Sequence, residues 1–594
     1  MIDPHTNPWE SWLQKWFVAL LVPAILVNTG GLFIAILEPD GALYATIAKT
    51  MARSGDFINL RVEGKDWLDK PHFPFWMAAL SFRIFGIHAF AYKLPALLFW
   101  GAGAWYTYRL AFSLYGKPIA QLSALIYVSA AHLVISNNDV RAEPYLTGLV
   151  IGSVYHFYKA SRAKPGPDAS RTRPFLHLAA GSGLAACAIM TKGPFILLTI
   201  SAGFILDWIV GKEWQQFRNI RWWIALLLIM LFILPELYCL YVQFDLHPER
   251  TVFGHTHVSG VRFFFWDSQF GRFFNTGPIR GSGDPFFYFH TLLWAFLPWS
   301  LLLYAAIVQK CRGLRRAGPG DGQDAGTGNR PRAVPGDGIC LGAALASFAL
   351  FSLSRFQLPH YLNILFPFFS ILTAGYLYGV RRRKTYRIIR IVQGIITVLL
   401  PVLLLFLTEY FHFNRWPVLL AALLLLSLLP FWLFRGSELP VPIMRSFYAA
   451  LLAFAFVNFF LYPAILRYQA GTQAGGYIGT WRSGISLPVP GEASPPDLYM
   501  PEEAPSNYSF EFSSPLPVRR IPVDSLRAIT AAGPVLVFSS SSFADSLKAK
   551  GFHVGILRQF PNFHVSQLTG EFLDYRTRAS VLEWYSMIWV GRQP

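Results

Sequence analysis

Long apolar runs alternate with short polar segments over the first 469 residues of the chain. A helix that crosses a bilayer needs about 20 mostly apolar residues, and thirteen segments come near that length or exceed it. Three of them are short or interrupted by polar residues, at 118–135, 143–159 and 338–353. The pattern predicts an α-helical polytopic membrane domain over residues 1–469. The other ten predicted spans are 14–37, 88–114, 174–191, 193–210, 222–243, 286–309, 360–380, 387–408, 416–434 and 444–468.

The pattern changes after residue 469. Residues 470–515 are rich in Pro, Ser and Gly and are expected to form loops. Three short apolar runs follow, with the length and residue types of strands, at 534–540, 551–560 and 579–591. We therefore predict a small mixed α/β domain over residues 470–594.

Composition agrees with a membrane protein. Hydrophobic residues make up 54% of the chain and charged residues only 14%, whereas soluble domains carry about 25% charged residues. These values exclude an ordinary soluble enzyme, a disordered chain and a fibrous chain. The first apolar run is long and lacks a small-residue cleavage pattern, so we expect a span there and not a cleaved signal peptide.

The net charge of +18 comes with cations gathered in alternate loops. Loops rich in Lys and Arg stay on the cytoplasmic side of a membrane, and the chain is therefore expected to begin in the cytoplasm. After thirteen spans, residues 470–594 then lie on the outer face. No nucleic-acid recognition motif accompanies the basic runs, so we exclude nucleic acid as a partner. The cation-rich loops are 160–173, 211–221, 381–387 and the Gly- and Pro-rich 310–337, which we expect to be a flexible cytoplasmic linker.

The largest polar segment on the predicted outer side is 38–87, directly after the first span. Its stretch 42–55 (ALYATIAKTMARSG) predicts a helix that ends at Gly55. Residues 72–86 are amphipathic and aromatic, as in helices that lie in the membrane interface. A loop that carries its own interfacial helices is well placed to act on a lipid phosphate.

Three charged residues of this segment have alternative interpretations. Asp40 either caps the predicted helix or is a general base that faces a cavity. Asp69 and Lys70 are either an adjacent solvated pair, or Lys70 is a phosphate ligand held near the headgroup plane. The residue types alone leave both alternatives open.

Two further outer positions carry charge at the boundary of a span. The segment SNNDVRAEPYLTG (136–148) offers Asp139, Arg141 and Glu143. An ionisable group at the depth of Glu143 is costly and marks a functional candidate, the alternative being an Arg141–Glu143 pair that caps the helix. Lys192, in MTKGPF, lies near the outer interface, where it binds a substrate or reaches out to lipid phosphate.

The outer loop 244–285 is long for a membrane connector, and long ordered loops are often functional. Its Arg272 is a candidate phosphate ligand. His255 and His257 raise the question of a zinc site, which we disfavour because no nearby carboxylate or Cys completes a ligand set.

The segment SRFQLPHYLN (354–363) places Arg355, His360 and Tyr361 at another outer span boundary. With it, the outer side gathers several cations and several carboxylates. Cations hold a phosphate and offset its charge as it leaves, and a carboxylate activates an attacking group that needs activation. Because no Gly-rich phosphate loop or Walker motif is present, we predict transfer of a sugar from a lipid-linked donor and not from a nucleotide sugar.

Four segments resemble one family. Residues 38–86 (EPDGALYATIAKTMARSGDFI…DWLDKPHFPFWMAALSFRIFG), TKGP (191–194), DPFFYFHTLLWAFLPWS (284–300) and SRFQLPHYLNILFP (354–367) are similar to bacterial aminoarabinose (4-amino-4-deoxy-L-arabinose) lipid A transferases. That family is related to the protein O-mannosyltransferases and has the GT-C membrane fold. The resemblance implies about 13 transmembrane helices, interfacial helices and a periplasmic C-terminal domain in a bacterial inner membrane.

The resemblance also implies roles for individual residues. Asp40 matches the family's first-loop catalytic acid, and Glu143 stands where the family has an acid at the start of the fourth span. Lys70 and Arg272 match residues that hold the carrier phosphate, and we add Lys192 to them because of its position. The predicted cavity further contains Tyr44, Asp69, Asp139, Arg141, Arg355, His360 and Tyr361.

The implied reaction moves 4-amino-4-deoxy-L-arabinose, or a related pentose or hexose, from undecaprenyl phosphate to lipid A, with inversion. No cofactor or metal is implied, and a divalent cation is compatible with the site. Three residues depart from the family pattern: Gly41 replaces a second acid, Leu43 a common Arg, and His72 the second Pro of an acidic-Lys-Pro-Pro stretch. The absent Arg points to a different sugar or a different way of holding it.

Two other functions are compatible with the sequence: a glycosyltransferase with a different acceptor, and a protein that is not a transferase. An acceptor in a protein or an envelope polysaccharide would make the chain a glycosyltransferase of the protein O-mannosyltransferase type or a polysaccharide-modifying one. A flippase for a lipid-linked sugar is the alternative from another class. We disfavour it because transporters often show inverted repeats with broken helices, and none is visible in the sequence.

Overall fold

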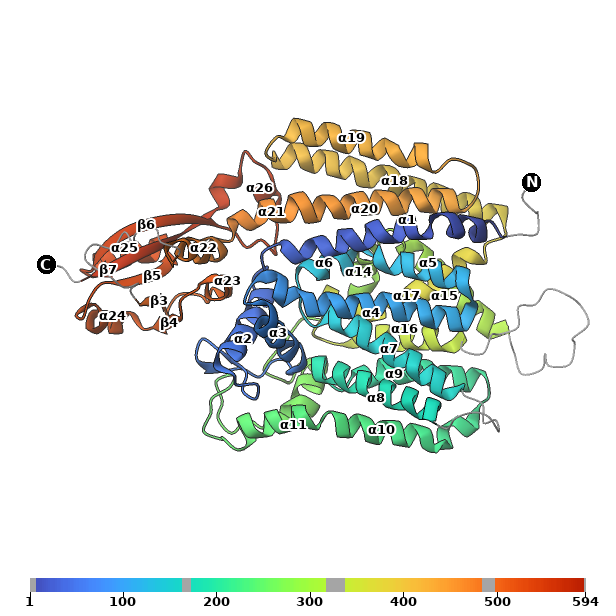
Figure 1. Cartoon of the computed structure of the whole chain (residues 1–594), viewed down its shortest axis with the longest axis horizontal. Coiled ribbons are helices and arrows are strands. Elements are labelled where there is room, and N and C mark those ends of the chain that lie inside the picture. The colour runs from blue at the N-terminus through green and yellow to red at the C-terminus, as the bar shows by residue number, and fades with distance from the viewer. Residues whose placement is uncertain (1–6, 163–171, 317–336, 483–496, 592–594) are drawn as a thin grey trace, which may run out of the picture.

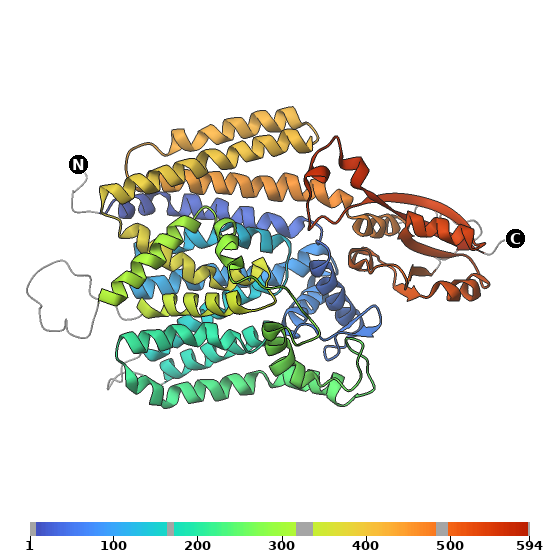
Figure 2. The ribbon, with the colours of Figure 1, turned by 180° about the vertical axis from the view of Figure 1, so that it is seen from behind.

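The computed structural model describes residues 7–162, 172–316, 337–482 and 497–591. Long helices run side by side in a bundle, and a smaller domain with a β-sheet lies at one end of it (Figure 1). The N-terminus lies at the opposite end of the bundle, as the view from behind also shows (Figure 2). The bundle therefore has one end that faces the C-terminal domain and one that faces away.

The helices of the bundle coincide with the predicted apolar runs. Hydrogen bonds within a helix satisfy all of its interior main-chain groups, which a bilayer core requires. Several predicted spans are formed by two consecutive helices, such as α5 and α6, which meet at a bend of 50°. The helices are α1 (Pro8–Gly30), α4 (Ala89–Tyr115), α5 (Lys117–Val128), α6 (Ala131–Asn138), α7 (Glu143–Ser161), α8 (Thr172–Lys192), α9 (Ile196–Val210), α10 (Ile220–Phe232), α11 (Leu234–Leu240), α14 (Phe287–Ala295), α15 (Ser300–Arg316), α16 (Asp337–Leu353), α17 (Phe366–Tyr378), α18 (Arg383–Phe411), α19 (Trp416–Leu433), α20 (Pro440–Phe456) and α21 (Tyr462–Ile465).

Length and composition alone mark fewer spans than the sequence pattern does. In the part of the chain that the structure describes, seven helices are long and apolar enough to cross a membrane, or eight if α5 and α6 form one span. The helices α9 and α16 are apolar but shorter than 18 residues. The chain is a multi-pass helical membrane protein, and the count of thirteen spans stays a prediction.

The predicted interfacial helices of the first outer loop are present. The first is α2 (Asp40–Ser54), which ends at Gly55 with a φ of +75°, a left-handed conformation that favours glycine. The second is α3 (Phe73–Phe85), and a hairpin of β1 (Arg61–Val62) and β2 (Lys65–Asp66) connects them. The outer loop 244–285 contains α12 (Gly260–Arg262), a π-helical segment (Phe263–Gly271) and α13 (Arg272–Phe274).

The C-terminal domain contains, among the described residues, a five-stranded sheet in the order β4-β3-β5-β7-β6. Its first three strands in that order are parallel, and β7 runs antiparallel to both of its neighbours. The three predicted strands are confirmed as β5, β6 and β7. The elements are α22 (Ala470–Arg482), β3 (Leu498–Pro501), α23 (Tyr508–Ser513), β4 (Val518–Ile521), α24 (Val523–Thr530), β5 (Val535–Ser540), α25 (Ser541–Ala549), β6 (His553–Asn562), α26 (Gly570–Leu573) and β7 (Glu583–Gly591).

Two predictions of irregular structure are wrong in part. Residues 470–482, expected to form a loop, are helix α22, because Ala470, Ala474 and Ile478 lie four residues apart and pack together in the core of the sheet domain. The linker predicted at 310–337 begins as a helix, since α15 continues to Arg316. Most of the remaining linker lies outside the described residues.

The C-terminal domain is docked on the first outer loop through the short helix α23. The buried ammonium of Lys49, in α2, donates to three carbonyls at the end of α23, those of Glu511 (2.5 Å), Phe512 (2.8 Å) and Ser514 (2.8 Å). At the other end of α23, the carboxylate of Glu38 accepts the main-chain N–H of Ser509 at 2.7 Å. A cation at the carboxyl end of a helix and an anion at its amino end both complement the helix dipole.

Candidate active site

A cavity of about 150 Å³ opens at the end of the bundle that carries α2 and the C-terminal domain. It is bounded by the first outer loop, the start of α7, the end of α8, Arg272 and the segment before α17. Its apolar lining consists of Leu43, Ala142, Ile279, Phe356 and Leu358. Its polar and aromatic wall consists of Asp40, Tyr44, Asp69, Lys70, Arg141, Glu143, Lys192, Arg272, His360 and Tyr361.

Asp69 holds two cations together at one side of this cavity. Lys70 Nζ lies 2.5 Å from Asp69 Oδ2, and the guanidinium of Arg272 pairs with the other carboxylate oxygen. Burial by itself would raise the pKa of Asp69, but the two neighbouring cations lower it overall. The Nε–H of Arg272 is buried and has no hydrogen-bond partner among the described residues.

Arg141, also in the lining of the cavity, links two carboxylates. Its Nη1 lies 2.7 Å from Asp40 Oδ2 and its Nη2 lies 2.7 Å from Asp139 Oδ2. Asp40 is the first residue of α2, and no side chain caps that helix. The helix-cap interpretation of Asp40 is therefore wrong, as is the proposed Arg141–Glu143 pair. The side chain of Asp40 keeps 39% of its surface exposed, which leaves it accessible from the cavity.

Glu143 and Lys192 form a buried ion pair at the base of the cavity. The side chain of Lys192 is only 6% exposed, and its Nζ lies 3.7 Å from the centre of the Tyr361 ring. Lys192 therefore points inward and does not reach out to lipid phosphate. His360 Nε2 lies 3.6 Å from Glu143 Oε1, which brings a fourth polar side chain into the same cluster.

The comparisons with known proteins agree with one another. The family described as dolichyl-phosphate-mannose-protein mannosyltransferase matches residues 69–239. An undecaprenyl phosphate-alpha-4-amino-4-deoxy-L-arabinose arabinosyl transferase of Edwardsiella ictaluri is 27% identical over 342 residues, 57% of this chain and 55% of that protein. A transferase of the same name from Pseudomonas fluorescens is 27% identical over 325 residues, 53% of this chain and 52% of its own length. The matches thus span about half the length of these transferases.

The fold extends over the rest of the chain. The crystal structure of ArnT from Cupriavidus metallidurans bound to undecaprenyl phosphate has a TM-score of 0.70, with 98% of this chain and 99% of that chain covered at 18% identity. The apo structure of the same protein has a TM-score of 0.69. This chain is similar in sequence to bacterial aminoarabinose transferases over about half of its length, and it shares the GT-C fold of the ArnT structure. The resemblance predicted from the four sequence segments is confirmed.

Not every residue predicted for the GT-C cavity lies in it. Arg355 is exposed and does not line the cavity, although its main-chain N–H donates to Phe273 O at 3.2 Å. Asp139 also lies outside the lining and contacts Arg141, which does line it. His255 and His257 are exposed, and the described residues contain no group of three or more His, Cys, Asp or Glu that could hold a metal ion.

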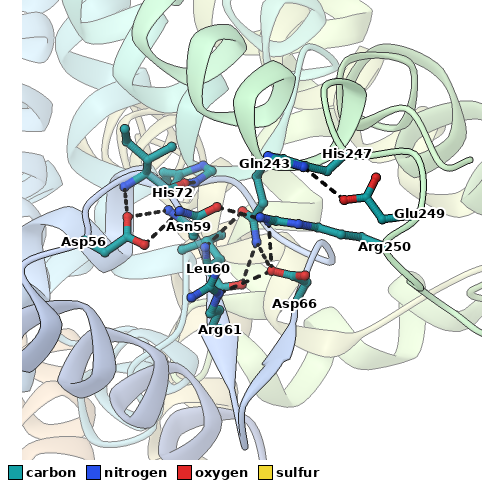
Figure 3. Close-up of polar contacts among 11 residues, drawn as sticks. Asp56, Asn59, Leu60, Arg61, Asp66, His72, Gln243, His247, Glu249 and Arg250 are labelled. Atoms are coloured by element: carbon teal, nitrogen blue, oxygen red, sulfur yellow. Dashed lines mark hydrogen bonds and ion pairs between the residues drawn. The ribbon is translucent and has the colours of Figure 1, made fainter. Parts of the chain in front are cut away.

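Sequence reasoning missed a polar network behind the cavity. Figure 3 shows Gln243, which follows α11, in contact with Leu60 and Asp66. The side-chain oxygen of Gln243 accepts from the main-chain N–H of Leu60, and its side-chain N–H groups donate to the Leu60 carbonyl and to Asp66. Arg250 also donates to Asp66, at 3.3 Å. These bonds attach the end of the helical segment that contains α11, and the start of the outer loop 244–285, to the β1–β2 hairpin of the first outer loop.

The same region contains an ion pair between His72 and Glu236 of α11, both with fully buried side chains. Glu236 interrupts the apolar run 222–243. A carboxylate inside a predicted span is the signal that singled out Glu143, and the same signal identifies Glu236.

Proposed function

We propose that this protein is an integral-membrane glycosyltransferase that moves a sugar from a polyprenyl phosphate to lipid A or a related envelope acceptor. The observation that carries the proposal is a single cavity lined both by the cations Lys70, Lys192 and Arg272 and by the carboxylate of Asp40, which keeps 39% of its side-chain surface exposed. The names of the transferase relatives and the fold shared with an undecaprenyl phosphate-bound protein support the same donor.

The donor phosphate binds at Lys70 and Arg272. Asp69 fixes both cations at one place and still leaves the pair with a net positive charge. Lys192 borders the same side of the cavity and is held in place by Glu143. Positive charge positioned before the reaction stabilises the negative charge that develops on the leaving phosphate.

The reaction is a direct displacement at the anomeric carbon. An acceptor oxygen attacks that carbon from the face opposite to the phosphate, and the carbon–oxygen bond to the carrier breaks. The polyprenyl phosphate leaves with the bonding electron pair, so the configuration inverts. A phosphate acceptor is already ionised at neutral pH, and Asp40 then orients the sugar or its amine. A hydroxyl acceptor needs a base, and Asp40 takes its proton.

The two parts of the chain have different tasks in this proposal. Residues 1–469 form the transferase domain, with its cavity open to the periplasm, and residues 470–594 form a periplasmic domain. The cation-rich loops at the opposite end support a cytoplasmic N-terminus.

Transfer by proteoliposomes that contain the purified protein tests this function. Radiolabelled undecaprenyl-phosphate sugars are supplied, and lipid A, glycan and protein fractions are extracted separately. We expect label in lipid A, and label in another fraction would identify a different acceptor. Donor that crosses the bilayer without covalent transfer to any of them would overturn the proposal in favour of a flippase.

The variant Asp40→Asn removes the charge of the accessible carboxylate and preserves its size. With a hydroxyl acceptor we expect transfer to fall at least about a hundredfold, the usual contribution of a general base. With a phosphate acceptor we also expect a loss of transfer, because the charge that orients the sugar or its amine is removed. The matched control is Asp524→Asn, because Asp524 is exposed on α24 in the C-terminal domain. Near-normal transfer by Asp40→Asn would contradict the role given to Asp40.

A further inference from the structure

Glu236 brings a buried negative charge to the wall of the phosphate site. A narrow pocket lies behind the main cavity, and its lining includes Asp69, Lys70, Lys192 and Arg272 together with Glu236. Asp69 is paired with Lys70 and Arg272, whereas Glu236 is paired with His72. The charge of His72 therefore determines whether the negative charge of Glu236 is compensated or repels an anion bound at Lys70 and Arg272.

The hydrogen bonds of His72 indicate a doubly protonated ring. Nδ1 lies 3.0 Å from the Glu236 carboxylate, and Nε2 lies 2.9 Å from the carbonyl oxygen of Ile58. The carbonyl oxygen only accepts hydrogen bonds, and so does the carboxylate of Glu236 in its ionised form, so each ring nitrogen carries a proton when it bonds to the ionised carboxylate and the carbonyl. His72 is the residue that bears the positive charge of this buried pair.

The same residue also attaches the phosphate-binding segment to α11. The main-chain N–H of His72 donates to the second oxygen of the Glu236 carboxylate at 3.0 Å. Lys70 precedes His72 by two residues, with Pro71 between them. Glu236 thus holds His72 by its main chain and by its ring, which restricts where Lys70 lies.

We infer that His72 is a positioning residue for the donor phosphate: its imidazolium cancels the charge of Glu236 and fixes the Asp69–Lys70–Pro71 segment against α11. The inference rests on the proposed function, because it assumes that Lys70 and Arg272 bind the phosphate of the carrier. A neutral His72 leaves one uncompensated negative charge beside that phosphate and weakens its binding.

The inference predicts a dependence of donor binding on pH. Burial by itself lowers the pKa of His72, but the Glu236 carboxylate outweighs it, and the net shift is above the ordinary value of 6.5. The acids that face His72 are Glu236 on α11 and Asp56 on the loop before β1, and Cys239 lies near both acids. Binding is therefore strong at low pH and weakens as the pH rises through the raised pKa of His72.

A double-mutant cycle tests the inference on the purified full-length protein, with undecaprenyl phosphate as the ligand. His72→Asn keeps an N–H near the position of Nδ1 but removes the charge, and we expect the Kd to rise about tenfold, since one unpaired charge in a partly buried site is worth that much or more. Glu236→Gln removes the opposing charge, and its Kd is expected to stay within about twofold of the unmodified protein. The double variant H72N/E236Q is expected to restore binding.

A merely structural role predicts a different pattern. Both single variants would then weaken binding, and the double variant would be at least as weak as either. That pattern, or unchanged binding by His72→Asn, would overturn the inference. Chromatographic monodispersity and the melting temperature of each variant show whether it folds.

The pH profile provides a second test that does not depend on His72→Asn. The Kd of the unmodified protein is expected to rise with pH more steeply than that of Glu236→Gln, because the titration of the ligand is common to both. Parallel profiles would overturn the inference while leaving the proposed function intact. Absence of saturable binding by the unmodified protein at every pH would overturn both.

Discussion

Asp69 has the unusual task of serving two cations at once. Each of its two carboxylate oxygens pairs with one cation, so that Lys70 and Arg272 are held close together. One carboxylate charge does not neutralise both cations, and the cluster keeps a net positive charge. Burial deprives these charged groups of solvation. This loss of solvation lowers the pKa of Lys70 below its ordinary value, although the negative charge of Asp69 acts in the opposite direction. A phosphate in the cavity adds the missing negative charge, and the cluster is therefore better balanced with its ligand than without it.

Lys70 is expected to contribute directly to binding of the carrier phosphate. Lys70→Ala removes a charge-assisted contact worth about 1.5–3 kcal/mol, so the Kd for undecaprenyl phosphate is expected to rise about ten- to a hundredfold. Equilibrium binding to the purified protein measures it. Lys65→Ala is the matched control, because Lys65 is exposed on β2. If the two variants bind the ligand equally well, Lys70 is not a phosphate ligand.

The sequence predicted most of the cavity residues but not their partners. Asp40 and Glu143 were identified because they are charged residues at the ends of apolar runs, and Lys70 because it lies in the polar outer segment 38–87 near the predicted headgroup plane. Arg355 satisfies the same criterion and is nevertheless exposed, because the pattern indicates depth in the membrane but not the direction of a side chain. The His72–Glu236 pair was missed because its members are 164 residues apart, and no local pattern records such a contact.

At the scale of elements, the best-defined junction is that between α2 and α23. Lys49 places three N–H donors against three carbonyls of the C-terminal domain, and Glu38 holds the other end of α23. An ion pair between Glu63 and Arg520, at 2.9 Å, also joins the β1–β2 hairpin to β4. Because Asp40 is the first residue of α2, the C-terminal domain fixes the helix that carries it.

The prediction for this junction uses Lys49→Met, which retains the length of the side chain and removes its donors. Each buried carbonyl left without a partner costs about 1–3 kcal/mol, so α2 and α23 are expected to open more often. Hydrogen–deuterium exchange at 40–54 and 508–513 should then become faster. Lys548→Met, an exposed site on α25, should leave both segments unchanged; equal exchange in the two variants would contradict a clamping role.

The elements themselves were predicted unevenly. Helices and strands with strong periodicity, such as α2, α3 and β5, agree with the predictions from their residue patterns. The prediction failed at α22, whose several Gly residues favour loops and which precedes a stretch rich in Pro and Ser. Packing against the sheet stabilises that helix, and tertiary contacts of this kind regularly outweigh local propensity.

At the scale of the whole molecule, the helix α2, which lines the cavity, and the C-terminal domain lie at the same end of the bundle (Figure 1). The helix α18 runs the length of the bundle, from the cation-rich residues at its start to Phe411, whose carbonyl accepts from Arg578 of the C-terminal domain. The two ends of α18 therefore belong to opposite faces of the membrane. The positive-inside rule assigns the cation-rich end to the cytoplasm.

Cysteine labelling checks this orientation. In a variant without the native cysteines, Ser566→Cys in the C-terminal domain and Lys384→Cys at the start of α18 are both at exposed positions. A membrane-impermeant maleimide is expected to label Ser566→Cys in spheroplasts, and to label Lys384→Cys only after lysis. The reverse result would place the cavity in the cytoplasm and contradict a periplasmic reaction.

The α2–α23 junction also has a consequence for the order in which the protein is made. Lys49 and its partner Glu511 are 462 residues apart, and at about 5–20 residues per second a ribosome needs roughly 20 to 90 seconds to synthesise the chain between them. During that time α2 has already been synthesised, but the carbonyl groups of the C-terminal domain that bind Lys49 have not. A nascent or truncated chain is therefore expected to insert into the membrane without a finished site, so that it consumes no donor until the last domain has been translated and folded.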